Sequence, residues 1–134
     1  MNTFEYAPAP ESTALVDLKS VYGLFINGKF QPAKEGKTFQ TINPATGKPL
    51  AKIAFAAASD IDKAVNAATE SYKKVWSKMP AAERGKYLYR IARILQERSR
   101  EFAVLETMDN GKPIRETRDV DVPLAAAHFF YHAG

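Results

Sequence analysis

The chain has 134 residues, of which 46% are hydrophobic and 25% charged, a composition typical of one globular domain. Its formal net charge is +4, and it contains no cysteine, which excludes disulfides, a cysteine-ligated zinc and a thiolate nucleophile within these residues. No secretory signal and no apolar run of the ~20 residues that span a bilayer are visible, so we expect a cytoplasmic protein without membrane contact.

Residues 1–20 show no hydrophobic period and predict a flexible N-terminal tail ahead of a folded region over residues 21–134. The Ala-Pro repeats at residues 7–10 remove backbone donors and favour extended backbone. Residues 24–26 and 29–30 flank Asn27-Gly28, a pair typical of a two-residue hairpin turn because it tolerates positive φ at both positions. A second strand pair is predicted over residues 38–42 and 49–55, on either side of an Asn-Pro-Ala-Thr-Gly turn.

The remaining residues predict helices. Ser59 is placed to cap the first helix, and Pro80 stands where a first-turn proline is tolerated in the second. Apolar residues of the first helix recur at helical spacing at Ile61, Ala64, Val65, Ala68, Tyr72 and Val75. Those of the second helix are Tyr87, Leu88, Ile91, Ile94 and Leu95.

A third helix is predicted from a cap at Ser99 to a left-handed end at Asn110-Gly111. Pro113 begins another helical stretch, and Asp121 and Pro123 predict a break before a final helix over residues 124–133. This order gives β-hairpins followed by four or five helices, without a parallel sheet. No strand, Gly-rich turn and helix follow one another, so no pyrophosphate site of the Rossmann type is predicted.

The run LETMDNGKP at residues 105–113 resembles the ETxDNGKP signature of the aldehyde dehydrogenase superfamily. Further stretches resemble the N-terminal region of that family, in the family's order and spacing. They are LFINGKF at 24–30, FQTINPATG at 39–47, ASDIDKAVNAA at 58–68, WSKMPAAERG at 76–85 and YHAG at 131–134. The resemblance covers residues 24–134.

The resemblance implies a three-layer α/β fold with a Rossmann-like coenzyme domain, of which residues 21–134 form a truncated N-terminal part. A full-length member oxidises an aldehyde to a carboxylic acid with NAD or NADP, using a cysteine nucleophile and a glutamate that lie beyond Gly134 in the family pattern. We therefore expect this chain alone to bind no cofactor and to be inactive, and its partner to be the remainder of such a chain or a homologous subunit. The aromatic residues Phe129, Phe130 and Tyr131 also predict a larger core around the last helix.

The resemblance also implies a cation site. In several family members a monovalent cation lies near the residue matching Asp109 and near backbone carbonyls matching Thr41 and Ile42. Carboxylate and carbonyl oxygens are suitable ligands for a hard cation. In the alternative interpretation, Asp109 only ends a helix at the turn that follows it.

Val120 and Leu124 match positions that line the substrate tunnel in the family, and apolar walls there favour aldehydes with an apolar body. In the alternative interpretation both are ordinary core residues of an amphipathic helix. His128 and His132 share a helical face, but no third ligand stands at metal spacing, so two ordinary histidines are expected.

Six basic residues follow one another from the second helix into the third: Arg84, Lys86, Arg90, Arg93, Arg98 and Arg100. They could track phosphates, but Glu83, Glu97 and Glu101 lie among them, so a salt-bridged surface is expected and no nucleic-acid partner. Two alternatives to the enzyme remain. One is a non-catalytic truncated paralogue that docks on a full-length subunit, and the other is a basic nucleic-acid binder.

Overall fold

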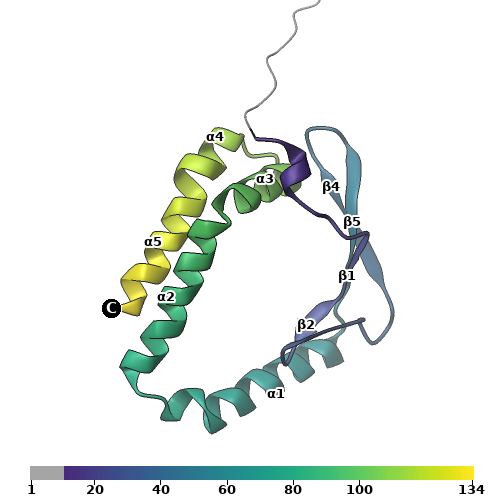
Figure 1. Cartoon of the computed structure of the whole chain (residues 1–134). Coiled ribbons are helices and arrows are strands. Elements are labelled where there is room, and N and C mark those ends of the chain that lie inside the picture. The colour runs from purple at the N-terminus through teal and green to yellow at the C-terminus, as the bar shows by residue number, and fades with distance from the viewer. Residues whose placement is uncertain (1–10) are drawn as a thin grey trace, which may run out of the picture.

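The computed structural model describes residues 11–134 (Figure 1). The strands are β1 (Val21–Tyr22), β2 (Leu24–Ile26), β3 (Lys29–Gln31), β4 (Thr38–Asn43) and β5 (Lys48–Ala54). The α-helices are α1 (Ala58–Lys74), α2 (Ala81–Glu97), α3 (Ser99–Asn110), α4 (Ile114–Glu116) and α5 (Val122–Ala133). Two 3-10 helices, η1 (Thr13–Leu15) and η2 (Trp76–Lys78), and a π-helical turn, η3 (Thr117–Asp121), complete the order.

Both predicted hairpins are confirmed. β2 and β3 pair antiparallel, and Asn27 and Gly28 at their turn have φ values of 52° and 77°. Two consecutive positive φ values are what the mirror-image hairpin turn requires, which explains the Asn-Gly pair. β4 and β5 also pair antiparallel, with a register shift between Thr41 and Ile42.

A short parallel pairing corrects the expectation of hairpins alone. β1 pairs with β5, Val21 opposite Lys52, which gives a sheet in the order β1-β5-β4. Two residues are too few to produce an alternating pattern, so the sequence contained no signal for β1. No helix lies between β1 and β5 in the chain, so this pairing is not the βαβ unit of a coenzyme-binding sheet.

Contacts begin before Val21, inside the stretch predicted as a tail. The Ser12 hydroxyl accepts a hydrogen bond from the Ala14 N–H (3.1 Å) at the start of η1. The Glu11 carboxylate, whose side chain is only 4% exposed, pairs with Arg118 at 2.9 Å. The Ala-Pro repeats at residues 7–10 lie outside the described residues.

The start of α1 corrects the predicted cap. The helix begins at Ala58, so Ser59 lies inside its first turn and caps nothing. Asp60 does the capping instead, since its carboxylate accepts from the N–H groups of Ala57 (3.0 Å) and Lys34 (3.1 Å). A carboxylate inside the first turn satisfies free N–H groups and interacts favourably with the helix dipole.

The predicted Ser99 cap of α3 is wrong. Ser99 is the first residue of the helix, and Arg98 occupies the cap position before it. Arg98 forms an ion pair with Glu101 at 2.6 Å, one turn into the helix. The predicted end is confirmed: Gly111 has φ 79° and its N–H donates to the Thr107 carbonyl at 3.0 Å. A left-handed glycine is a common helix C-terminus because it lacks a Cβ.

The predicted break at Asp121 and Pro123 is a π-helical turn between α4 and α5 rather than an interruption of the helix. Pro123 lies in the first turn of α5 and has no N–H, so the carbonyl four residues before it loses its normal donor. A wider turn at η3 accommodates that loss while the helical path continues.

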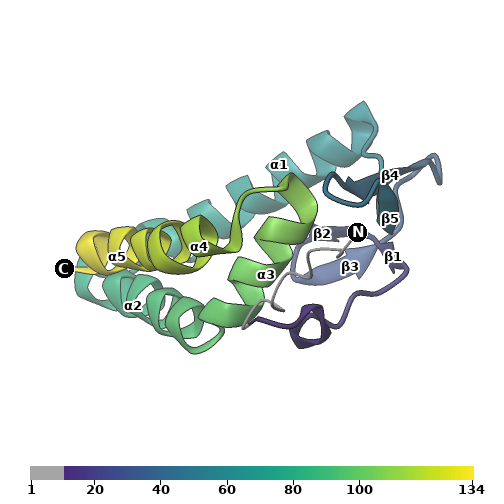
Figure 2. The same cartoon turned by 90° about the horizontal axis from the view of Figure 1, so that it is seen from above.

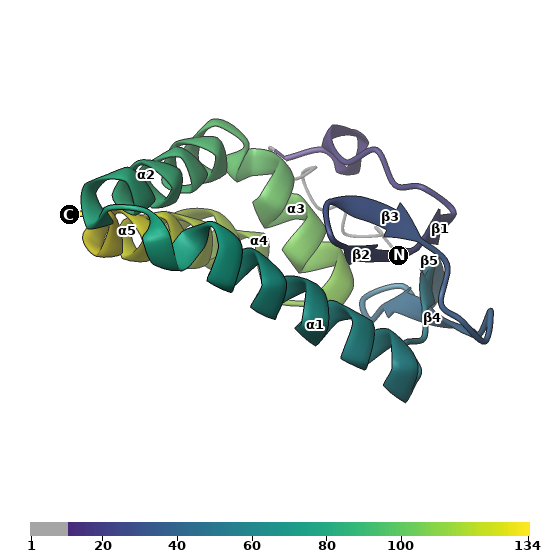
Figure 3. The same ribbon diagram turned by 90° about the horizontal axis from the view of Figure 1, so that it is seen from below.

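Helices α2 and α5 lie side by side in every view (Figures 1, 2 and 3), while α1 runs away from them toward the strands. Gly85 on α2 is buried against α5, and a Cβ there would collide with the Ala133 carbonyl oxygen. The buried apolar side chains of the described part are mostly small. They are Ile26, Ala33, Ala51, Ala54, Ala92, Ala103, Val104, Val122 and Ala126.

We expect Gly85→Ala to lower the free energy of unfolding of this chain by about 1–2 kcal/mol. Overpacking costs ~1–3 kcal/mol, and the gain of up to ~1 kcal/mol in helix propensity offsets only part of it, because the colliding atom is backbone. Urea denaturation measures the difference. Lys86→Ala, at the next and exposed position of α2, should change stability by no more than ~0.5 kcal/mol. A Gly85→Ala variant as stable as the parent would contradict the close packing of α2 on α5.

A candidate cation and substrate-wall site

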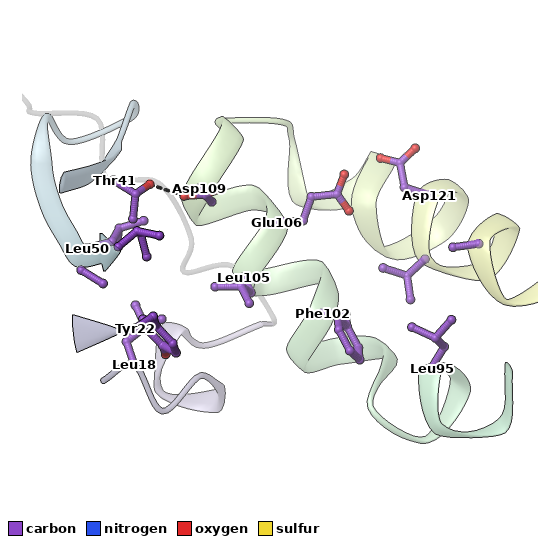
Figure 4. A pocket seen from close by; sticks show the side chains of 14 residues that line it. Leu18, Tyr22, Thr41, Leu50, Leu95, Phe102, Leu105, Glu106, Asp109 and Asp121 are labelled. Carbon is purple, nitrogen blue, oxygen red and sulfur yellow. Dashed lines mark hydrogen bonds between the residues drawn. The ribbon is translucent and has the colours of Figure 1, made fainter. Parts of the chain in front are cut away.

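A cavity of about 470 Å³ separates α3 from the β1-β5-β4 sheet (Figure 4). Its walls are mainly apolar and come from the residues before β1, from the sheet, and from α2, α3 and α5. The apolar lining consists of Leu18, Tyr22, Leu50, Ala51, Ile53, Leu95, Phe102, Leu105, Val122 and Ala125. The polar lining consists of Thr41, Glu106, Asp109 and Asp121. The cavity therefore has an apolar interior and an acidic rim.

The acidic rim is partly neutralised by Lys112. Glu106 and Asp109 lie one turn apart on α3, and Asp121 lies on η3. Lys112 forms an ion pair with Asp121. This hydrogen bond, together with the nearby charges of Asp121 and Glu106, raises the pKa of the Lys112 ammonium above its ordinary value. The Lys112 charge therefore offsets the acidic rim at its Asp121 end.

Thr41 and Asp109 meet in the structure although 68 residues separate them in the chain. Figure 4 shows the two side chains reaching toward each other from β4 and α3, and the Thr41 hydroxyl donates to the Asp109 carboxylate. Two of the three residues of the predicted cation site are thus in direct contact.

Ile42, the third residue, follows Thr41 on β4 at the register shift of the β4–β5 ladder. It lies opposite Pro49, which has no N–H to donate to the ladder. Register shifts leave backbone groups without their ladder partners. Ile42 thus directly follows the residue that contacts Asp109, at an irregular point of the ladder.

A hydroxyl pair that sequence reasoning missed joins α3 to η3. Thr117 is fully buried, and its Oγ1 lies 2.9 Å from the Thr107 Oγ1 and donates to the Ile114 carbonyl at 3.1 Å. Thr107 belongs to the LETMDNGKP run, but a single threonine at residue 117 has no sequence pattern that marks it as buried. This pair fixes η3, and with it Val120 and Asp121, relative to the acidic rim on α3.

Val120 and Leu124 lie one turn apart, on η3 and α5, with exposed fractions of 47% and 52%. Neither lines the cavity, whereas Val122 between them does. Within residues 11–134 nothing buries the two side chains, so they present an apolar surface one turn long beside the cavity.

The other candidate residues lie apart from this site. His128 and His132 line a shallow depression with Leu88 and Phe129, and no group of three or more His, Cys, Asp or Glu suited to a metal occurs in the described part of the chain. Of the basic residues, Lys86 pairs with Glu83 at 2.7 Å, Arg93 with Glu97 at 3.7 Å and Arg98 with Glu101 at 2.6 Å. The hydrogen bond to Arg98 lowers the pKa of the Glu101 carboxyl.

Residues 11–134 do not fit a dinucleotide coenzyme, because no strand among them is followed by a Gly-rich turn and a helix. None of their helices meets the length and hydropathy that a membrane span requires. The described residues therefore bring acidic side chains to an apolar cavity and supply no pyrophosphate-binding unit.

A model of the aldehyde dehydrogenase family matches residues 30–134. The chain is 46% identical over 118 residues to DhaS of Bacillus subtilis, covering 87% of this chain and 24% of that protein. It is 40% identical over 119 residues to the Saccharomyces cerevisiae protein named aldehyde dehydrogenase (NAD(P)+) 2, covering 89% of this chain and 24% of the relative.

Among solved structures, the NAD+ complex of an aldehyde dehydrogenase from Bacillus cereus superposes with a TM-score of 0.81 at 41% identity. That match covers 84% of this chain and 23% of the other. The chain thus spans about a quarter of the length of the relatives it matches. The family model, which covers most of the chain, agrees with the fold, and the chain belongs to the aldehyde dehydrogenase family.

Proposed function

We propose that this chain is the N-terminal portion of an enzyme that oxidises an aldehyde to a carboxylic acid with NAD or NADP. The observation that carries the proposal is the family match over residues 30–134, at 46% identity to one relative. The coenzyme would accept the hydride, and a cysteine outside these residues would attack the carbonyl. Residues of this chain would supply the cation site and a wall of the substrate tunnel.

We expect the purified 134-residue chain to reduce neither NAD nor NADP in the presence of an aldehyde, since it has no cysteine. Fused in place of the matching segment of the Bacillus cereus relative, it should support aldehyde-dependent NADH formation. Absorbance of the reduced coenzyme measures both, with the unmodified relative as the positive control. Reduction of the coenzyme by the isolated chain would contradict the expectation that this chain alone is inactive. A folded fusion protein without turnover would contradict the proposed function.

The proposed cation ligands are the Asp109 carboxylate and the backbone carbonyls of Thr41 and Ile42. The contact between Thr41 and Asp109 and the register shift beside Ile42 support this proposal. A bound cation would hold the strands against the end of α3, because its ligands come from both. Its expected role is therefore to stabilise the N-terminal portion rather than to take part in the reaction.

We expect potassium chloride to stabilise the parent chain more than the same concentration of tetramethylammonium chloride, and Asp109→Asn to abolish the difference. A ligand that binds only the folded state adds about 0.4 kcal/mol when its concentration equals its Kd. Thermal unfolding in the two salts measures the difference in the free energy of unfolding. Asp119→Asn is the matched control, because Asp119 is also exposed and pairs with Arg118 instead. An equal potassium increment in both variants would contradict the site.

The proposed wall residues are Val120 and Leu124, whose exposure beside the cavity supports a role in contacting substrate. In the fusion protein, we expect Leu124→Ala to raise KM for a long-chain aldehyde about tenfold with little change in kcat, because apolar contact made equally in ground and transition states affects KM. Acetaldehyde, which has almost no apolar body, is the control substrate. Equal changes for both aldehydes, or a loss of kcat alone, would contradict the assignment.

A second candidate function, a non-catalytic module that docks on other aldehyde dehydrogenase polypeptides, is favoured by the apolar side chains that α1 and α2 leave uncovered. The two functions differ in what they require. The enzyme requires that this chain, joined or bound to the remaining portion, oxidises an aldehyde. The module requires only that the two polypeptides bind.

A further inference from the structure

The segment ahead of β1 connects η3 with the sheet. We name residues 11–20 the N-terminal strap. Glu11 at its start forms an ion pair with Arg118 of η3. The strap then packs on α3 through η1, as Figure 1 shows. At its other end the Ser20 carbonyl accepts a hydrogen bond from the Lys52 N–H of β5 at 3.0 Å. The strap therefore ties a helical turn at one end to the strands at the other.

The Glu11 end of the strap is a buried carboxylate with one charged partner. Its Oε1 accepts a hydrogen bond from Arg118 Nη1 at 2.9 Å, and only 4% of the Glu11 side chain is exposed. Its Oε2 is buried as well and has no hydrogen-bond partner among the described residues. A buried carboxylate is costly unless a positive charge lies beside it. The contact with Arg118 is therefore what makes the buried position of Glu11 tolerable.

The guanidinium of Arg118 is oriented by a second carboxylate. Its Nε and Nη2 donate to the two carboxylate oxygens of Asp119, at 2.6 and 2.8 Å. This fork-like pairing fixes the plane of the guanidinium and leaves Nη1 directed at Glu11. Arg118 therefore holds the strap in a defined direction, which a single mobile charge would not do.

The other polar contacts of η3 lead to α3 and to the turn that follows it. Thr117 pairs with Thr107, and Asp121 pairs with Lys112, all near neighbours in the chain. Glu11 is 107 residues from Arg118. Within residues 11–134, the strap thus supplies the long-range polar contact of η3. A π-helical turn is rare and frequently marks a functional site, so the contact that holds it from outside the helix is a candidate for a functional role.

The proposed wall residue Val120 follows Arg118 by two residues on the same turn. Side chains two residues apart on a helix do not face each other. Glu11 therefore holds one side of η3 while Val120, which is exposed, lies on another. A shift of the turn at Arg118 would consequently move Val120 as well, because one short helical turn carries both.

We propose that Glu11 is a positioning residue that acts through Arg118 to set the place of η3, and with it the contact of Val120 with the apolar body of an aldehyde. The inference rests on the proposed function in that Val120 contacts the substrate. Because Glu11 acts on the wall and not on the reacting carbonyl, it should affect selectivity between aldehydes and leave the rate of the chemical step unchanged.

The structural part of the proposal is tested on the 134-residue chain. We expect Glu11→Ala to speed hydrogen exchange of the amides of residues 117–121 about fivefold, because η3 loses its contact with the strap. Amides of α1 should be unaffected. Glu35→Ala is the matched control, since Glu35 is exposed and pairs with Lys37 at 2.8 Å instead. Exchange followed by NMR measures both. Unchanged exchange at η3, or an equal increase in α1, overturns the proposal.

The functional part is tested in the fusion protein with the Bacillus cereus relative. Glu11→Ala should raise KM for a long-chain aldehyde about threefold, with kcat and the KM for acetaldehyde unchanged. Glu11→Gln keeps an acceptor oxygen at the same reach and should restore most of the parent KM. In a Val120→Ala background, Glu11→Ala should raise KM no further, because a positioning effect requires the residue that is positioned.

Three results in the fusion protein overturn the proposal: an equal rise in KM for acetaldehyde, a fall in kcat alone, or a full threefold effect that persists beside Val120→Ala. A parent fusion protein that folds but does not oxidise aldehydes contradicts the proposed function instead. In that case the exchange rates of residues 117–121 still decide whether Glu11 positions η3.

Discussion

The C-terminal end of α3 connects the strands to the helices, and the placement of the other elements follows from this junction. Gly111 ends the helix in a left-handed conformation, and a Cβ at this position would lie 2.6 Å from the Pro44 ring. The carboxylate of Asp109, two residues earlier, accepts a hydrogen bond from the Thr41 hydroxyl. The same turn of helix therefore ends α3, seats the 43–47 turn against it and forms one wall of the cavity. Residues of the LETMDNGKP run therefore have a structural role, because they pack the end of α3 against the strands.

Polar contacts rather than a large apolar core hold the rest of the chain to this junction. Thr107 and Thr117 bind η3 to α3, the Asp60 carboxylate binds the loop at Lys34 to the start of α1, and Glu11 reaches Arg118. The buried apolar side chains are mostly alanine and valine, which remove little surface from water. The larger apolar side chains of α1 and α2, such as Ile61 and Tyr87, meanwhile stay exposed.

Features encoded by neighbouring residues could be predicted from the sequence. The Asn27-Gly28 turn and the Gly111 helix end both depend on local backbone freedom, and both were confirmed. The predicted Ser59 cap was wrong because the Asp60 carboxylate accepts hydrogen bonds from Ala57 and from Lys34. Lys34 is distant in the chain, so capping rules based on neighbouring residues could not include it. Strand β1 is set by its partner rather than by its own two residues.

In the candidate site, too, contacts between distant residues could not be predicted from local sequence patterns. The proximity of Thr41 and Asp109, which are 68 residues apart, was expected only through the family resemblance, because no periodicity relates positions so distant. Thr117 was missed since burial of a lone threonine is decided by the elements around it. The amphipathic pattern of α1 was predicted, but the sequence could not show that its apolar side stays uncovered, which depends on where every other element packs.

The π-helical turn at η3 acts as a phase shift in an otherwise continuous helix. One additional residue in a helical turn rotates everything after it by roughly 100° about the axis. Val122 and Ala126 thereby reach buried positions while Leu124 stays outside. A relative that gained or lost one residue at this turn would present a different set of α5 side chains beside the cavity, with helix length and loops unchanged. The side chains that α5 presents beside the cavity thus depend on the angular setting of the helix as well as on the identity of its residues.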